Sequence, residues 1–181
     1  MNNSFISKND IDNIGFKSVG KTVLISRRAS FYSPEKISIG SNVRIDDFCI
    51  LSGNIAIGDN VHISAGTYLF AGDSKIVIGN HVSISSRCAV YAISDDFNGR
   101  FLVGSMEKDI YRNVIKKDVF IEDFVAIGTG STILPGAILS EGSAIGAMSL
   151  VKDTLEPWFI YVGVPCLKLK RRKRISRGEF K

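Results

Sequence analysis

The sequence is poor in the residues from which several common kinds of functional site are built. Its 181 residues include three cysteines, two histidines, four prolines and one tryptophan. The cysteines, Cys49, Cys88 and Cys166, are odd in number and form no CxxC pair, so neither a disulfide framework nor a zinc knuckle is indicated. Two histidines also cannot supply a three-histidine zinc site. We therefore expect reduced structural thiols and no metal.

A long hydrophobic run is missing as well. The longest charge-free stretch, residues 124–140, is interrupted by glycines and a proline and contains Ser and Thr, which makes it a poor membrane span. The N-terminus has no basic start followed by an apolar block, so no secretory signal is indicated. These absences predict a cytoplasmic protein.

Acidic residues are scarce only at the C-terminal end. Residues 168–181 hold eight basic residues and one acidic residue, whereas the rest of the chain holds 15 basic and 17 acidic residues and is nearly neutral. Such a basic tail can contact a phosphorylated cofactor, an anionic membrane surface or nucleic acid, or it can be solvated with no partner. Nucleic acid is not expected, because no aromatic residue is interleaved with the basic residues over 168–177.

What the sequence does contain is a six-residue repeat of large aliphatic residues. It runs in three registers: Ile39, Ile45, Leu51, Ile57, Ile63 and Leu69; Ile78, Ile84 and Val90; Ile121, Ile127, Ile133, Leu139, Ile145 and Val151. A period of six fits neither an α-helix nor a coiled coil, and the intervening Gly, Asn and Asp would break helices. Three hexads make one eighteen-residue turn of a triangular parallel β-helix, with the aliphatic column inside.

Small or β-branched residues follow each aliphatic by four positions and are predicted to fill the corners. They are Val43, Cys49, Val61, Thr67, Val82, Cys88, Val125, Ser131, Ser143 and Ser149. Cys49 and Cys88 would lie two coils apart, roughly 9–10 Å, which is too far for a disulfide. Ile57 and Ile78 are separated by twenty-one residues, so a small bulge is expected at 73–75.

The repeat divides the chain into three parts. Residues 1–22 are predicted to form a cap, with a short helix near 9–14 that ends at Gly15. Residues 23–153 form the β-helix domain, which is interrupted at 94–118 by an excursion loop where the hexads stop. Residues 154–181 form a C-terminal extension with a short basic strand or helix. A loop of this length in a compact domain is usually functional.

In these features the chain resembles the hexapeptide-repeat acyltransferases, which are left-handed parallel β-helix enzymes, and especially sugar O- and N-acetyltransferases similar to galactoside and maltose acetyltransferases. The resemblance covers about residues 20–170 and is carried by the aliphatic-Gly hexads and by the stretches 133–138, 145–153 and 161–165. A looser likeness to acetyltransferases of surface-polysaccharide clusters rests on residues 44–48 and 94–97. The left hand is implied by the resemblance alone, because the usual right-handed crossover would predict the opposite.

The resemblance implies an all-β, acetyl-CoA-dependent enzyme that acetylates a hydroxyl or an amine of a sugar or nucleotide sugar, in surface-polysaccharide synthesis. It also implies a homotrimer, which we expect independently because Phe48, Tyr68, Phe70 and Phe124 would otherwise leave apolar surface exposed. The alternative is a catalytically inactive trimeric scaffold whose basic tail binds membrane or nucleic acid.

For the cofactor, the resemblance points to Thr129 and Ala147, which follow two Ile-Gly pairs eighteen residues apart. Both could instead be ordinary turn residues. Lys152 stands where relatives often have a Thr or Lys near the cofactor, and Lys168 and Lys170 stand near the place of basic residues that contact the 3′-phosphate end of coenzyme A.

The catalytic base is harder to place. Relatives usually carry a histidine in or just before the loop, where this chain has Ser94, Asp95 and Asp96. We predict His62 as the base, pointing outward beside Ser64; the alternative is a structural or interface histidine. Asp95 and Asp96 could orient His62, bind sugar hydroxyls, or form a loop turn.

The remaining candidates contact the acceptor or have no catalytic role. By the resemblance Ser64 contacts the acceptor, and Asp46 and Asp47 in the stretch 44–48 are expected to do so as well. His81 is expected to be a solvent-exposed turn residue.

Overall fold

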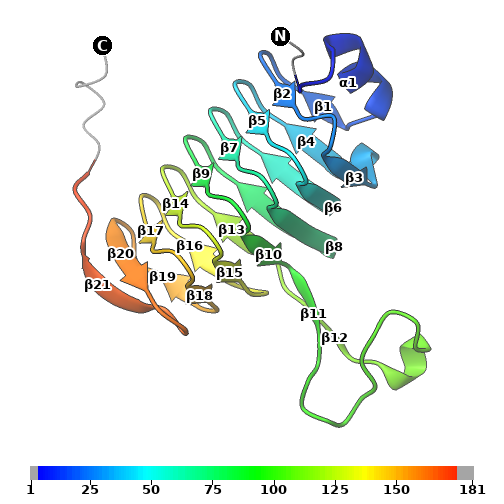
Figure 1. Ribbon diagram of the computed structural model, residues 1–181. Coiled ribbons are helices and arrows are strands. Elements are labelled where there is room, and N and C mark those ends of the chain that lie inside the picture. Colours follow the sequence, from blue (N-terminus) through cyan, green and yellow to red (C-terminus); the bar gives the residue numbers. More distant parts are fainter. Residues whose placement is uncertain (1–3, 175–181) are drawn as a thin grey trace.

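The six-residue repeat forms short strands that stack from coil to coil into a left-handed parallel β-helix (Figure 1). A computed structural model describes residues 4–174. Strands of successive coils pair in parallel at the expected eighteen-residue offset, as Arg44 does with His62 and Ala126 with Ala144. The predicted all-β fold class is confirmed.

Each coil contributes to three flat faces. Face 1 consists of β2 (Leu24–Ile25), β5 (Arg44–Ile45), β7 (His62–Ile63), β9 (Ser83–Ile84), β14 (Ala126–Ile127), β17 (Ala144–Ile145) and β20 (Phe159–Val162). Face 2 consists of β3 (Ser30–Tyr32), the first halves of β6 (Ile50–Ile57) and β8 (Tyr68–Ile78), β10 (Ala89–Tyr91), β15 (Thr132–Ile133) and β18 (Leu150–Val151). Face 3 consists of β1 (Ser18–Val19), β4 (Ile37–Ile39), the second halves of β6 and β8, β13 (Val119–Ile121), β16 (Ile138–Leu139) and β19 (Thr154–Leu155).

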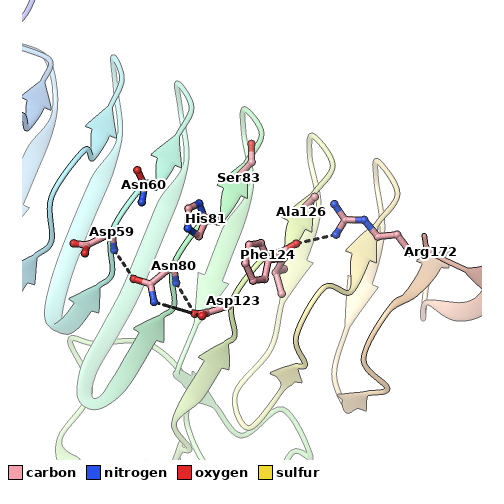
Figure 2. A pocket seen from close by; sticks show the side chains of 10 residues that line it. Asp59, Asn60, Asn80, His81, Ser83, Asp123, Phe124, Ala126 and Arg172 are labelled. Atoms are coloured by element: carbon pink, nitrogen blue, oxygen red, sulfur yellow. Dashed lines mark hydrogen bonds between the residues drawn. The ribbon is translucent and has the colours of Figure 1, made fainter. Parts of the chain in front are cut away.

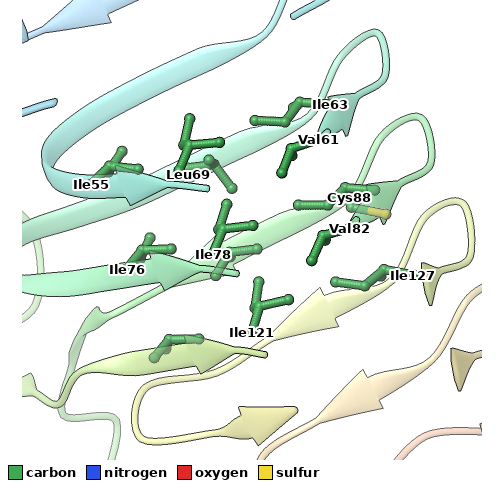
Figure 3. Packing of buried hydrophobic residues seen from close by; sticks show 14 of the residues in the cluster. Ile55, Val61, Ile63, Leu69, Ile76, Ile78, Val82, Cys88, Ile121 and Ile127 are labelled. Atoms are coloured by element: carbon green, nitrogen blue, oxygen red, sulfur yellow. The ribbon is translucent and has the colours of Figure 1, made fainter. Parts of the chain in front are cut away.

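The predicted aliphatic column is the core. Every one of its fifteen members is buried, with at most 4% of its surface exposed. Figure 3 shows part of the column, including Ile63, Ile78 and Ile127. The ten predicted corner residues are buried as well. Burying an aliphatic side chain of this size stabilises a fold by about 1.5–3 kcal/mol, so the column is the main stabilising element. Cys49 and Cys88 are free and buried, as expected for structural thiols.

The irregularity between Ile57 and Ile78 also lies where the spacing places it. Ser52 pairs with Phe70, Gly53 with Gly72 and Asn54 with Lys75, so β8 has three extra residues at the corner between faces 2 and 3, one before Gly72 and two after it. The 3-10 turn η1 (Pro34–Lys36) occupies the same corner two coils earlier.

Two of the four aromatic residues expected on flat faces lie at corners instead. Phe48 and Phe124 have left-handed backbone angles, with φ of 62° and 61°, and each forms part of a turn. Tyr68 and Phe70 do lie on face 2, where Phe70 stacks with Tyr91 at 5.5 Å between ring centroids. The hexad pattern does not separate a corner aromatic from one on a face, because both point outward.

The N-terminal end is covered by helix α1 (Lys8–Ile14), which confirms the short helix predicted near 9–14. Ser7 caps its start in a capping box with Asp10, and Gly15 ends it with a φ of 84°. Ile11 packs onto the core. Strand β1 already pairs with β4, so the first coil begins at residue 18.

The excursion loop leaves the β-helix at the corner between faces 2 and 3 (Figure 1). Strands β11 (Ile93–Asp95) and β12 (Val114–Lys116) pair antiparallel at its base, and the 3-10 turn η2 (Asp109–Tyr111) lies within it. The coils resume with β13 at Val119, next to the predicted boundary.

Over its described residues, 154–174, the C-terminal extension contains strands and no helix. Strand β21 (Leu167–Arg171) pairs antiparallel with β20 and closes the last coil of face 1. No helix among residues 4–174 is long and apolar enough to cross a membrane.

Candidate active site

His62 lies outward on face 1 and has a carboxylate partner within the same chain. Its Nε2 is 2.8 Å from Oδ2 of Asp46, and the other oxygen of Asp46 accepts a hydrogen bond of 2.6 Å from Nε of Arg44. The His62 side chain is 42% exposed, whereas that of Asp46 is 17% exposed. The imidazole is therefore accessible while the carboxylate behind it is largely covered.

This contact assigns the two ring nitrogens different roles. The pKa of Asp46 lies below its ordinary value, because hydrogen bonds from His62 and Arg44 together outweigh burial, which alone would raise it. The ionised carboxylate accepts a hydrogen bond from Nε2–H, which leaves the lone pair of Nδ1 to take up a proton. The arrangement can act as a general base.

Sequence reasoning placed Asp46 among the acceptor contacts and missed its pairing with His62. The signal was present: residues sixteen apart lie on neighbouring coils, two positions short of one full turn. Asp47, the adjacent acceptor candidate, accepts hydrogen bonds from Arg28 at 2.8 Å and from Ser26. Ser64 is half-buried at the end of β7, where face 1 turns into the next corner.

Asp95 and Asp96 lie at the base of the excursion loop and are bonded inside it. Asp95 accepts hydrogen bonds from Arg112 at 2.9 Å and from the Gly104 amide at 3.0 Å, and these lower the pKa of its carboxyl group. Asp96 accepts one of 2.8 Å from Asn113. The loop leaves the β-helix at the corner between faces 2 and 3, whereas His62 lies on face 1. Within one chain, therefore, His62 is oriented by Asp46 and not by Asp95 or Asp96.

Thr129 and Ala147 lie on neighbouring coils at the corner between faces 1 and 2. Within residues 4–174 neither backbone N–H has an acceptor, because the pairing N–H groups of this corner belong to Gly130 and Met148. The two coils approach closely here: a Cβ on Gly128 would lie 2.5 Å from the Ala147 nitrogen. The corner therefore presents free amide donors at the spacing of the coils, which suits an extended chain of amides such as pantetheine.

The three candidate lysines are distributed over different parts of the molecule. Lys152 is exposed beyond β18, at the next corner after that of Ala147. Lys168 pairs with Glu156 and lies 4.4 Å from the centre of the Phe159 ring, which itself packs against the core. Lys170 pairs in register with Ile160 and is exposed.

Much of the basic tail packs against the chain itself. Arg171 lies over Phe159, Arg174 lies over Trp158, and Arg172 donates to backbone carbonyl groups of two coils. The rest of the predicted tail, residues 175–181, lies outside the described residues. No group of three or more His, Cys, Asp or Glu that could hold a metal ion occurs within residues 4–174.

A hollow of about 690 Å³ lies beside Arg172, between face 1 and the corner that joins face 3 to face 1 (Figure 2). Its lining residues are Asp59, Asn60, Asn80, His81, Ser83, Asp123, Phe124, Val125, Ala126 and Arg172. His81 is exposed in a turn, as predicted, but its ring also stacks on that of Phe124. Sequence reasoning did not identify this hollow.

Comparison with known proteins agrees with the fold. The family model for the bacterial transferase hexapeptide, described as six repeats, matches residues 36–71. A dTDP-4-amino-4,6-dideoxy-D-glucose acyltransferase from Escherichia coli is 40% identical over 174 residues, which is 94% of this chain and 90% of that protein.

Two solved structures of AntD, an N-acyltransferase from Bacillus cereus, superpose closely. The complex with dTDP and 3-hydroxybutyryl-CoA has a TM-score of 0.94 and 52% identity, covering 95% of this chain and 92% of that one. A serine variant in complex with dTDP-4-amino-4,6-dideoxyglucose and coenzyme A has a TM-score of 0.94 and 50% identity, covering 96% and 93%.

Proposed function

The chain belongs to the bacterial hexapeptide-repeat transferase family, and from this premise we propose that it transfers an acyl group to the amine of a dTDP-linked amino sugar. It is an acyltransferase that uses an acyl-coenzyme A donor and a sugar acceptor. The proposed acceptor, a dTDP-linked amino sugar, rests on two relatives that match nearly the whole chain. One is named for such a sugar and the other was solved in complex with it. The observation that carries the proposal within this chain is the His62–Asp46 contact on an open face.

The chemistry requires that the amine lose a proton as it attacks the thioester carbonyl. His62 takes this proton at Nδ1, while Asp46 holds Nε2–H and stabilises the imidazolium that results. Proton transfer then allows the tetrahedral intermediate to expel coenzyme A as the thiol. A hydroxyl acceptor would need the same base more strongly, because its proton is less acidic than that of an ammonium group.

The acyl donor is proposed to lie along the corner that carries Thr129 and Ala147. Their free amide groups can donate to the carbonyl groups of pantetheine, one for each coil. Lys152 and Lys170 are the lysines left to contact the phosphates, since Lys168 is engaged with Glu156.

We propose a homotrimer in which the excursion loop covers a neighbouring chain. The loop exposes large apolar side chains, among them Phe97, Met106 and Ile110, and the exposed Tyr68 lies on face 2. In such an assembly Asp95 and Asp96 would approach the face of a second chain and could bind the acceptor there. A role in the synthesis of a surface polysaccharide fits an enzyme that modifies an activated sugar.

No specific observation favours the inactive scaffold. Its basic tail would have to be free for a membrane or nucleic acid, yet Lys168, Arg171 and Arg172 already contact the last coils.

The test is to replace His62 by Ala and to measure acyl transfer to dTDP-4-amino-4,6-dideoxyglucose. We expect kcat to fall by about 10²–10⁴-fold while the Kd for acyl-CoA stays unchanged, since the donor contacts other residues. Asp46→Asn should lower kcat less, because the base remains but its orientation is lost. Leu24→Ala, outward on the same face, is the matched control. A folded His62→Ala enzyme that retains more than about a third of kcat would assign His62 a structural role.

A further inference from the structure

The residues inside the corner between faces 1 and 2 differ in polarity from those inside the corner that joins face 3 to face 1. Both corners have the same backbone turn, in which the residue before the buried one is left-handed. Inside the first corner lie Cys49, Thr67, Cys88, Ser131 and Ser149; inside the second lie Val43, Val61, Val82, Val125 and Ser143. All ten are buried. Because the turns are alike, their shape does not account for the polar residues of the first corner.

The polar residues inside the first corner make the same hydrogen bond on four coils in succession. Each donates its O–H or S–H to a carbonyl oxygen of the next coil. The four bonds run from Cys49 to Ser64 at 3.2 Å, from Thr67 to Ser85 at 3.1 Å, from Cys88 to Gly128 at 3.2 Å and from Ser131 to Gly146 at 3.0 Å. Burial raises the pKa of the Cys49 and Cys88 thiols, so both keep the hydrogen that they donate. One bond made by three residue types indicates that the donor itself matters.

Each of these carbonyl groups shares its peptide bond with an outward N–H group. These N–H groups belong to Ala65, Ser86, Thr129 and Ala147, and within residues 4–174 none of them has an acceptor. At the corner that joins face 3 to face 1, several N–H groups in the equivalent place of the turn are capped: those of Ser41, Asp59 and Asn80 donate to the side chains of Asp59, Asn80 and Asp123. Free amides thus occur where a buried donor holds the carbonyl, and capped amides occur where valine lies inside.

A buried donor acts on the outward N–H of the same peptide group in two ways. The peptide group is planar and trans, so a bond that holds its C=O inward also holds its N–H outward. Because the amide is conjugated, a hydrogen bond to its oxygen also polarises the N–H and makes it a stronger donor. Ser131 is arranged for this role, since its oxygen accepts from the Ser149 N–H at 3.2 Å and its hydroxyl hydrogen is left for Gly146.

We infer that Cys88 and Ser131 are positioning residues of the acyl-donor site. Cys88 acts on the pantetheine arm through the amide of Thr129, and Ser131 acts on it through the amide of Ala147. Neither side chain touches the donor, because both are fully buried. The inference rests on the proposed function, which places the donor along this corner.

The test is calorimetric titration of coenzyme A into Ser131→Ala and Cys88→Ala. Each variant loses the buried donor behind one amide, so the Kd for coenzyme A should rise about 2–12-fold, the worth of one neutral hydrogen bond. Adenosine 3′,5′-bisphosphate, a fragment of coenzyme A without pantetheine, should bind the variants and the wild type alike. Ser131→Thr should bind coenzyme A as the wild type does, because Thr67 makes the same bond at the same corner.

Ser143→Ala is the matched control. Ser143 occupies the inward position of the other corner and is equally buried, and within residues 4–174 its hydroxyl has no hydrogen-bond partner. Its replacement should leave the Kd for both ligands unchanged. If Ser143→Ala weakens coenzyme A binding as much as Ser131→Ala does, the effect is a general loosening of the core and the inference is wrong.

Amide NMR spectra separate this inference from the proposed function. In the wild type, coenzyme A should shift the N–H signals of Thr129 and Ala147. In free Ser131→Ala, the Ala147 N–H signal should move upfield, because the amide is less polarised. If coenzyme A leaves both wild-type signals in place, the donor lies elsewhere, and its proposed course is wrong together with the inference. If it shifts them but the folded Ser131→Ala and Cys88→Ala variants bind coenzyme A within about two-fold of the wild type, only the inference is wrong.

Discussion

The β-helix wall, meaning the three faces outside the loop, and the excursion loop hold their functional side chains in different ways. In the wall, His62 stands on a strand whose backbone bonds to the coils on both sides, and its neighbour Ile63 is fully buried. In the loop, large apolar side chains such as Met106 and Ile110 are exposed, and Asp95 is held chiefly by Arg112 and the Gly104 amide. The wall therefore positions a group by packing, whereas the loop positions one by a few polar contacts.

The largest difference between the two regions is expected when one isoleucine in each is truncated to alanine. Ile84→Ala in the wall removes a fully buried side chain, and unfolding in urea should show a loss of about 2–5 kcal/mol. Ile110→Ala in the loop, where the residue is 78% exposed, should change stability by no more than about 0.5 kcal/mol. Equal losses would mean that the loop is packed as tightly as the wall in the assembled protein.

A second comparison adds one methyl group to a glycine in each region. At Gly128 the new Cβ would lie 2.5 Å from the Ala147 nitrogen, so Gly128→Ala should force two coils apart and lower stability by about 2–3 kcal/mol. At Gly99 nothing lies within 4 Å, and only the positive φ of 85° opposes the change, which should cost about 1 kcal/mol. Thermal unfolding of the two variants measures the difference. A Gly99→Ala protein that is the less stable of the two would contradict the close packing of coils at the Thr129 corner.

A third variant tests whether the ion pair between Arg112 and Asp95 holds the loop. Arg112→Met removes the ion pair to Asp95 but leaves the wall untouched, so the melting temperature should hardly move. Hydrogen exchange of the Gly104 amide, which donates to Asp95, should become several-fold faster. Arg100→Met, on the same loop, is the control, because the Arg100 side chain has no ion pair within residues 4–174. Unchanged exchange at Gly104 would show that the loop does not depend on Arg112.

The smallest expected effect is a pH dependence confined to the loop. Arg112 lowers the pKa of Asp95 in the folded state, so this carboxylate stabilises the loop above its unfolded pKa of about 3.9. That contribution is lost as the pH falls through the lowered folded value. Exchange at Gly104, after correction for the intrinsic rate, should therefore be faster at acid pH than at neutral pH. The Asp95→Asn variant should lack the difference; if it keeps the difference, another carboxylate is responsible.

The sequence alone was enough to predict the β-helix because each residue of a hexad has one environment. Ile133 points inward, as do the aliphatic residues six positions before and after it. A corner residue such as Ser131 is buried as well and must be small to fit the turn. The same reasoning predicted the bulge after Gly72 and the helix that ends at Gly15. Local chemistry and the repeat agree at these positions, and the buried surface enforces them.

Other features were decided by the tertiary structure, because they depend on pairs of residues on different coils. Three contacts illustrate this: Asp46 pairs with His62, His81 stacks on Phe124, and Lys168 lies over Phe159. In each pair, the type of one residue does not predict its contact with the other. The period determines which coil and which face a residue occupies. Side-chain length, rotamer and the competing partners within about 5 Å determine what an outward residue contacts, and these exist only once the coils are stacked.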